Sequence, residues 1–199
     1  MNHTPKTLLI TGFEPFGGQT INPSWEAVLA LPSQIGNYEL TKLQIPTEFH
    51  RAAEYVLDQA DRLKPDVILC IGQAGGRKGI TPEVIAINLQ EASIPDNAGN
   101  QPTNTPVIPD GPAAYFSTTP IREMVKEMQD HSIPCSLSYS AGAFVCNDVF
   151  YTLSHHYAGT QTRIGFIHVP FLPEQAKKNE PGLPLDQIVK GLCSCIEVL

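Results

Sequence analysis

The sequence has little charge and no concentration of positive charge. Charged residues make up 17% of the 199 residues, and the formal net charge is −7. Lysine and arginine adjoin each other at most in pairs, as at positions 77–78 and 177–178. Proteins that bind nucleic acid gather these residues on one face or along one helix. The sequence therefore predicts no nucleic-acid partner.

Long hydrophobic runs are also missing. No stretch is both long and apolar enough to cross a bilayer. The first apolar run, at 8–10, stands where an export signal would lie, but it is short and continues directly into the pattern of a first strand. We therefore expect no membrane contact and a cytoplasmic location.

Several motifs that would define a site are absent. The five cysteines, an odd number, have no C-x-x-C pair, and they argue against a disulfide framework. Cys193 and Cys195, together with His155 and His156, do not match zinc-site spacing, so we expect no metal. The sequence contains neither a Walker P-loop, nor G-x-G-x-x-G, nor the G-x-S-x-G of serine hydrolases.

What the sequence does contain is an alternation of strand and helix patterns. Short apolar runs, typical of buried strands, occur at 8–11, 40–45, 67–71, 84–89, 135–139 and 164–169. Helical patterns lie between them, one after Asn22-Pro23-Ser24, one from Thr47 to about Ala60, one after Thr119-Pro120, one through 146–153, and one from near Pro184 to Leu192. This order predicts a three-layer α/β/α sandwich with a mostly parallel sheet, in a single domain over residues 1–199.

One segment interrupts the alternation. Residues 90–112 carry five prolines and several turn dipeptides. So long an irregular stretch inside a compact domain is usually functional, so we expect either a functional loop or an oligomer contact.

Cys146 and His168 are the first candidates for catalysis. In open α/β sheets, sites form beyond the carboxyl ends of the strands. His168 lies at the end of the run 164–169, and Cys146 follows the run 135–139 and begins a helix. A helix N-terminus and a nearby imidazolium both favour a thiolate, which predicts a nucleophilic Cys146. An inert buried cysteine and an ordinary core histidine remain the alternatives.

Glu83 is the candidate that would orient the imidazole. It precedes the run 84–89 and follows a glycine-rich loop, GQAGGR, at 72–77. Glu83 reaches the edge that bears Cys146 and His168 only if its strand runs antiparallel to the preceding one. The hypothesis therefore requires a mixed sheet, and an ordinary surface glutamate is the alternative.

These residues stand within a set of motifs spread over nearly the whole chain, namely LLITGFEPFGG, NPSWEA, IGQAGGR, ITPEVIAIN, IPDNAGNQP, DGPAAYFST, SAGAFVCN and GFIHVPFLP. In these motifs the chain resembles the pyroglutamyl peptidase I family of cysteine exopeptidases. The resemblance assigns the catalytic glutamate to Glu83, the nucleophile to Cys146 and the histidine to His168. It also implies a fold similar to the phosphorylase/hydrolase-like sandwich.

The same resemblance implies a substrate and its pocket. The family releases N-terminal pyroglutamate from peptides without a cofactor, and its bacterial members are commonly tetramers. An apolar aromatic slot suits an uncharged lactam ring. By motif match, the ring-binding pocket falls on Phe13, Phe16, Asn22, Thr47, Gln73, Ile94, Phe144 and Val145. Asn22 and Gln73 would offer polar contacts.

The chain departs from the family pattern at Ser93, where an arginine is usual, and at Val84, where a basic residue is usual. The departure at Ser93 leaves a non-catalytic relative that binds lactam peptides as one alternative to a peptidase. A nucleoside phosphorylase-like enzyme is another, because that family's fold is similar in sheet arrangement, but the missing basic phosphate loop counts against it.

Overall fold

The centre of the protein is a six-stranded sheet. The structure, a computed structural model, describes residues 5–199. The strand order is β2-β3-β1-β4-β8-β5. The strands are β1 (Lys6–Phe13), β2 (Gln34–Ile35), β3 (Tyr38–Ile45), β4 (Val67–Gln73), β5 (Thr81–Pro82) and β8 (Arg163–Val169). β3, β1, β4 and β8 are parallel, and the short edge strands β2 and β5 are antiparallel. The predicted mixed, mostly parallel sheet is confirmed.

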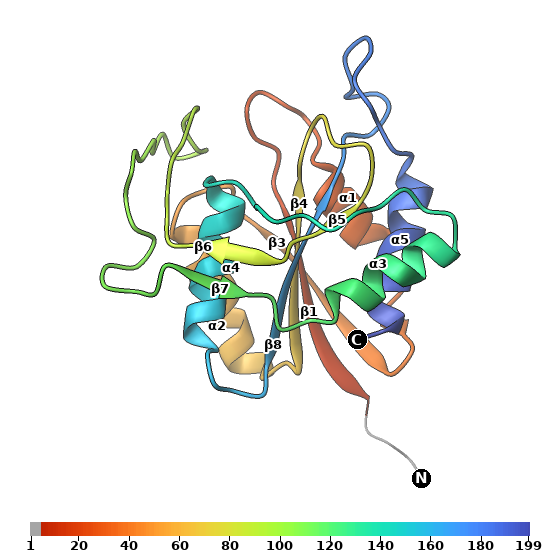
Figure 1. Cartoon of the computed structure of the whole chain (residues 1–199), viewed down its shortest axis with the longest axis horizontal. Helices are drawn as coiled ribbons and strands as arrows, with labels where there is room; N and C mark the ends of the chain where they lie inside the picture. Colours follow the sequence, from red (N-terminus) through yellow and green to blue (C-terminus); the bar gives the residue numbers. More distant parts are fainter. Residues whose placement is uncertain (1–4) are drawn as a thin grey trace.

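Five helices cover the two faces of this sheet (Figure 1). They are α1 (Pro23–Ala30), α2 (Arg51–Leu63), α3 (Ile121–Asp130), α4 (Val145–His156) and α5 (Leu185–Glu197). One buried cluster joins the sheet to α1, α3 and α5, and a second joins the opposite face to α2 and α4. The predicted three-layer sandwich is therefore confirmed. No helix among residues 5–199 has the length and apolarity needed to span a membrane.

The predicted capping residue begins the helix at α1 but not at α2. α1 begins as predicted, because the Asn22 side chain accepts a hydrogen bond from the Ser24 amide at 3.1 Å. α2 begins at Arg51 and not at Thr47. The Thr47 hydroxyl donates to the Glu14 carbonyl at 3.0 Å, so it holds a neighbouring turn instead of capping the helix.

The predicted strand at 84–89 is shorter than expected and lies outside the main sheet. It forms β6 (Ile85–Ile87), which pairs only with β7 (Ala114–Phe116). The buried Asn147 side chain on α4 accepts from the Ile87 amide and donates to the carbonyls of Ile87 and Leu89. A side chain thus satisfies backbone groups that a main-sheet neighbour would have paired.

The predicted strand at 135–139 is an extended segment without a continuous ladder. It makes isolated parallel bridges from Cys135 to Ile80 and from Ser138 to Glu83. Because β5 is antiparallel to β8, this segment also runs opposite to β8. The sequence argument assumed that this run points the same way as β8, so that its carboxyl end would lead to Cys146 at the edge that bears His168. That assumed direction was wrong.

The proline-rich segment is irregular, as predicted. It lies between β6 and β7, and it is fixed through Asp96. The buried Asp96 carboxylate accepts hydrogen bonds from the amides of Phe49 (2.9 Å), Ala98 (2.9 Å) and Asn100 (2.7 Å). The segment is therefore anchored to the residues that lead into α2.

Candidate active site

Glu83 and His168 form a buried hydrogen-bonded pair. The Nδ1 of His168 lies 2.7 Å from Oε1 of Glu83. Glu83 is fully buried and His168 is 3% exposed. A carboxylate can only accept, so Nδ1 carries the proton and Nε2 is left as an acceptor. This is the tautomer that a general base requires.

Strand pairing places the two residues together. Thr81 on β5 is the register partner of His168 on β8, and the Glu83 amide donates to the Phe166 carbonyl at 2.9 Å. The antiparallel strand that the hypothesis required is therefore β5, beside β8, and not the run 84–89 beside β4. The pairing fixes the backbone on both sides of the hydrogen bond.

Cys146 lies in the first turn of α4, directly above a glycine of the sheet. Gly72 on β4 is the register partner of His168 on β8. A Cβ atom built on Gly72 would lie 2.9 Å from Sγ of Cys146 and 2.8 Å from the ring of Phe166. Only glycine leaves room for the thiol at this rung of the sheet. The sulfur consequently lies over the strand pair that carries the imidazole.

The charge state of the thiol differs from the sequence prediction. Burial and, to a smaller extent, the negative charge of Glu83 raise the pKa of Cys146 to about 12, and the nearby Arg77 opposes them only in part. Burial also lowers the pKa of His168, although Glu83 opposes this effect. The free site at neutral pH therefore holds a thiol beside a neutral imidazole, and the predicted resting thiolate is wrong.

Glu83 remains ionised despite its burial. Burial by itself would raise its pKa, but the hydrogen bond and charge of His168, with smaller contributions from Ser138 and the charge of Arg77, together outweigh burial and lower the pKa. The guanidinium Nη1 of Arg77 lies 2.7 Å from Oε1 of Glu83, the same oxygen that His168 contacts. A charged acceptor thus stands behind the imidazole and stabilises the proton that it would take up.

Cys146 and His168 both face a cavity of about 260 Å³. Six of the eight predicted pocket residues line it, namely Phe13, Phe16, Asn22, Thr47, Gln73 and Phe144. The other two do not: Val145 is fully buried, and Ile94 is 42% exposed on the proline-rich segment. We refer to this space as the thiol cavity.

The rings of the thiol cavity come from separate segments of the chain, with Phe13 at the end of β1. Phe16 lies in the turn after β1, and its ring centroid is 5.9 Å from that of Phe144. Phe144 in turn meets Phe49 edge-on, with 5.2 Å between centroids. Phe13 packs inward against Phe166, at 6.3 Å. The result is a largely apolar slot that a thiol and an imidazole also line.

The predicted polar pocket residues are engaged in holding the cavity wall. The side chains of Asn22 and Thr47 each donate to the Glu14 carbonyl at 3.0 Å. Gln73 accepts from Gln175 Nε2 at 3.3 Å. Asn22 and Thr47 thus fix the turn that carries Phe16.

Arg77 is the site residue that sequence reasoning did not assign. It contacts Glu83, donates to the Thr81 hydroxyl, and reaches the Ser140 carbonyl at 3.2 Å. The available signal was its position as a basic residue that ends the glycine-rich loop at the functional edge. Ser93, where the family pattern has arginine, is exposed. Arg77 therefore brings a positive charge to Glu83 in the buried pair.

The residues weighed as a possible zinc set lie apart. His155 and His156 are on α4, whereas Cys193 and Cys195 are on α5, on the opposite face of the sheet. Within the described part of the chain, no group of three histidine, cysteine, aspartate or glutamate side chains could hold a metal ion.

Comparison with known proteins matches the chain over nearly its whole length. The family model described as pyroglutamyl peptidase matches residues 6–199. A pyrrolidone-carboxylate peptidase of Bacillus cytotoxicus is 50% identical, over 97% of this chain and 92% of the relative. One from Bacillus cereus is 48% identical with the same coverage.

Solved structures give the same result. The crystal structure of pyroglutamyl peptidase I from Bacillus amyloliquefaciens is 45% identical, with a TM-score of 0.94 over 98% of this chain and 95% of that one. The pyrrolidone carboxyl peptidase from Thermococcus litoralis is 36% identical, with a TM-score of 0.92 over 97% and 92%.

Proposed function

Because this chain belongs to the pyroglutamyl peptidase family, we infer that it hydrolyses the bond after an N-terminal pyroglutamyl residue and releases pyroglutamate from peptides. The observation that carries this conclusion is the family match over residues 6–199. It favours the peptidase over a non-catalytic lactam binder. The thiol cavity supports it, because an apolar slot accepts an uncharged ring at little desolvation cost.

We propose that Cys146 is the nucleophile and His168 the base. Sγ attacks the pyroglutamyl carbonyl carbon while its proton passes to Nε2 of His168, which gives a tetrahedral intermediate. The carbon–nitrogen bond then breaks, the proton moves from His168 to the leaving amine, and a thioester remains on Cys146. Water attacks the thioester with His168 again as base, and pyroglutamate leaves with the thiol restored.

Two further features support this sequence of steps. Because the free thiol is neutral, proton transfer and attack are coupled, and the Glu83 carboxylate stabilises the imidazolium as it forms. The amides of Asn147 and Asp148 donate to the Phe144 carbonyl, whereas those of Val145 and Cys146 precede the first helical hydrogen bonds. We propose the latter two amides as donors to the oxyanion.

Phe13, Phe16 and Phe144 are proposed to enclose the lactam ring, and Gln73 to give it a polar contact from the wall. Asn22 and Thr47 would act through the turn that they hold. Ile94 and Val145 do not line the cavity, so direct contact with the ring is not proposed for them.

Three further expectations from the sequence analysis remain proposals: a single domain, a cytoplasmic location and a homotetramer. The whole chain would form one catalytic domain, which is supported by the sheet that both helical layers share. A cytoplasmic location and assembly into a homotetramer rest on the sequence and its resemblance alone.

The test is hydrolysis of pyroglutamyl-arylamide beside prolyl- and glutamyl-arylamides, with the released arylamine followed by absorbance. We expect turnover of the pyroglutamyl compound and a rate at least about 100-fold lower for the other two, since one lacks the lactam carbonyl and the other brings charge into the slot. Equal turnover of all three, or none of the first, would contradict the proposal.

A further inference from the structure

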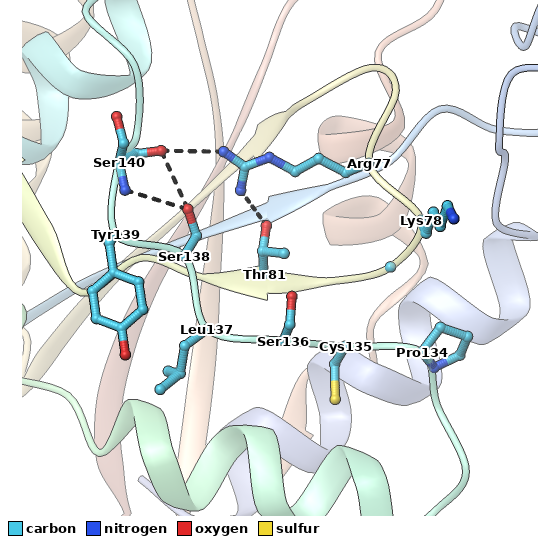
Figure 2. A pocket seen from close by; sticks show the side chains of 11 residues that line it. Arg77, Lys78, Thr81, Pro134, Cys135, Ser136, Leu137, Ser138, Tyr139 and Ser140 are labelled. Carbon is cyan, nitrogen blue, oxygen red and sulfur yellow. Dashed lines mark hydrogen bonds between the residues drawn. The ribbon is translucent and has the colours of Figure 1, made fainter.

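A second and larger hollow adjoins the thiol cavity. It has a volume of about 740 Å³, and its wall is formed by the residues around the start of β5 and by the extended segment 134–140, which are hydrogen-bonded to each other (Figure 2). Arg77, Lys78, Gly79, Thr81 and all seven residues of 134–140 line it. We call it the edge groove. At about 3.3 Å per residue, segment 134–140 is long enough to accompany several residues of an extended peptide.

The edge groove is continuous with the proposed active site. Arg77 and Ser140 line both the groove and the thiol cavity. Thr81, in the groove, is the register partner of His168 on the neighbouring strand. The groove therefore opens next to the strand pair that holds His168, and Ser140 connects segment 134–139 to the thiol cavity.

Segment 135–139 presents an unpaired strand edge there. The amides of Ser136 and Ser138 donate to the carbonyls of Ile80 and Pro82, toward β5. The intervening residues Cys135, Leu137 and Tyr139 make no backbone hydrogen bonds within residues 5–199, and in an extended chain their amides and carbonyls face the other way. Free groups at this spacing are what an added peptide strand pairs with.

The side chains of the groove include both hydroxyl and apolar groups, and their only charges are positive. Arg77 and Lys78 are its charged residues, and among the described residues no aspartate or glutamate lines it. Figure 2 shows the hydroxyls of Thr81 and Ser138 on the side of Arg77, and the side chains of Leu137 and Tyr139 on the opposite side. An extended peptide could thus meet hydroxyl groups on one side and an apolar surface on the other, and its carboxylate would meet no like charge.

We propose that the residues that follow pyroglutamate in the substrate bind at the rim of the edge groove, as an extended strand paired with the outward amides and carbonyls of 135–139, on the side of that segment away from β5. This inference rests on the proposed function and extends it from the ring to the leaving peptide. It makes an unmodified peptide of several residues, and not a pyroglutamyl amide alone, the substrate for which the site is built.

The first experiment compares kcat/KM for pyroglutamyl-arylamide with pyroglutamyl peptides that carry one, two, three or four alanines. We expect kcat/KM to rise by about 2- to 10-fold with each alanine up to the third, the range for one net hydrogen bond. A series that is flat beyond the first alanine would overturn the groove while leaving the proposed function intact. Failure to hydrolyse any member would instead overturn the function.

Two variants of Leu137 distinguish the contribution of its backbone amide from that of its side chain. Leu137→Pro removes an outward amide and leaves the inward hydrogen bonds of Ser136 and Ser138 in place, whereas Leu137→Ala keeps that amide. We expect Leu137→Pro, but not Leu137→Ala, to lose the gain from added alanines while both keep the arylamide rate. Equal behaviour of the two variants would overturn strand pairing.

A substrate variant covers the case in which Leu137→Pro does not fold. N-methylation of one peptide amide at a time in pyroglutamyl-trialanine removes one donor with the enzyme unchanged. We expect at least one position beyond the scissile bond to lose about 2- to 10-fold in kcat/KM. No loss at any position would contradict the proposal. So would a change in oligomer mass in Leu137→Pro with an unchanged length series, because the edge would then be a subunit contact.

Discussion

The two halves of the candidate site are built in different ways. Glu83 and His168 are positioned by adjacent antiparallel strands, and the hydrogen bond between them is 2.7 Å long and almost wholly buried. Phe16 and Phe144 are carried by turns, are partly exposed, and contact each other through ring edges and faces. Backbone pairing fixes the chemical half, whereas side-chain packing shapes the half that would recognise the lactam ring.

The difference indicates what each half can tolerate. A displaced hydrogen bond in a buried charged pair leaves its partner uncompensated, so small changes in the chemical half have large effects. Loss of one ring from a partly open slot removes only part of a contact surface. Substitutions in the first half should therefore lower turnover of all substrates, and substitutions in the second should alter the preference among them.

The largest expected effect is that of Cys146→Ser. A hydroxyl is far less acidic than a thiol, and the surroundings already raise the pKa of this thiol to about 12. We expect kcat on pyroglutamyl-arylamide to fall by more than about a thousand-fold, with an unchanged circular dichroism spectrum and unchanged pyroglutamate binding. Substantial activity would place the nucleophile elsewhere, and Cys70→Ser provides the control for loss of a buried thiol.

Glu83→Gln should have the next largest effect. The amide keeps the shape of the side chain but cannot stabilise the imidazolium, and its NH₂ group can favour the wrong tautomer of His168. We expect kcat to fall by roughly one to four orders of magnitude. The measurement is kcat as a function of pH, and an unaltered rate and profile would show that Glu83 is not part of the mechanism.

Phe16→Ala tests the other half. We expect kcat/KM for pyroglutamyl-arylamide relative to prolyl-arylamide to fall by about 10- to 200-fold, as for loss of an apolar pocket contact. Alkylation of Cys146 by iodoacetamide should keep its native rate, because the helix start and His168 are unchanged. Phe116→Ala, which removes a ring that is 70% exposed on β7, is the matched control. A collapse of alkylation with an unchanged preference would assign Phe16 to core packing.

The smallest expected effect is a shift in the pH profile of Arg77→Met. His168 must be neutral to accept the proton, so activity falls as pH drops through its pKa. Burial is the main reason that this pKa is low, and the charge of Arg77 lowers it further. Removal of that charge should raise the pKa, so we expect the acid limb of kcat/KM to move to higher pH. Lys78→Met, at a residue without an ion pair to Glu83 in the described structure, should not move it.

The layers of the fold could be predicted from the sequence, because apolar runs and helix signals are local. The three catalytic candidates could be grouped as well, although partly through a wrong path. The short β5 has too few residues to show a pattern, so the run 84–89 was taken for the strand that positions Glu83. Segment 135–139 was assigned the wrong direction, since apolar composition does not report orientation.

Properties that depend on packing were not accessible from the sequence. The raised pKa of Cys146 comes from its surroundings, and the clearance above Gly72 comes from a neighbouring strand and helix. Asn22 and Thr47 were expected to contact the substrate, but their side chains donate hydrogen bonds to the Glu14 carbonyl. Thr47 is far from Glu14 in the sequence, so only the fold reveals this contact. The role of Arg77 could not be predicted because its contacts with Thr81 and Glu83 form only in the folded chain.

The most direct test of the account is to locate the nucleophile with a reagent directed by the substrate. A pyroglutamyl chloromethyl ketone carries the lactam ring into the thiol cavity and alkylates the thiol that attacks it. The account predicts loss of activity with one equivalent of reagent bound, located by peptide mass spectrometry on Cys146, and protection by pyroglutamate. Loss of activity with the label on Cys70, Cys135, Cys193 or Cys195, and none on Cys146, would contradict it.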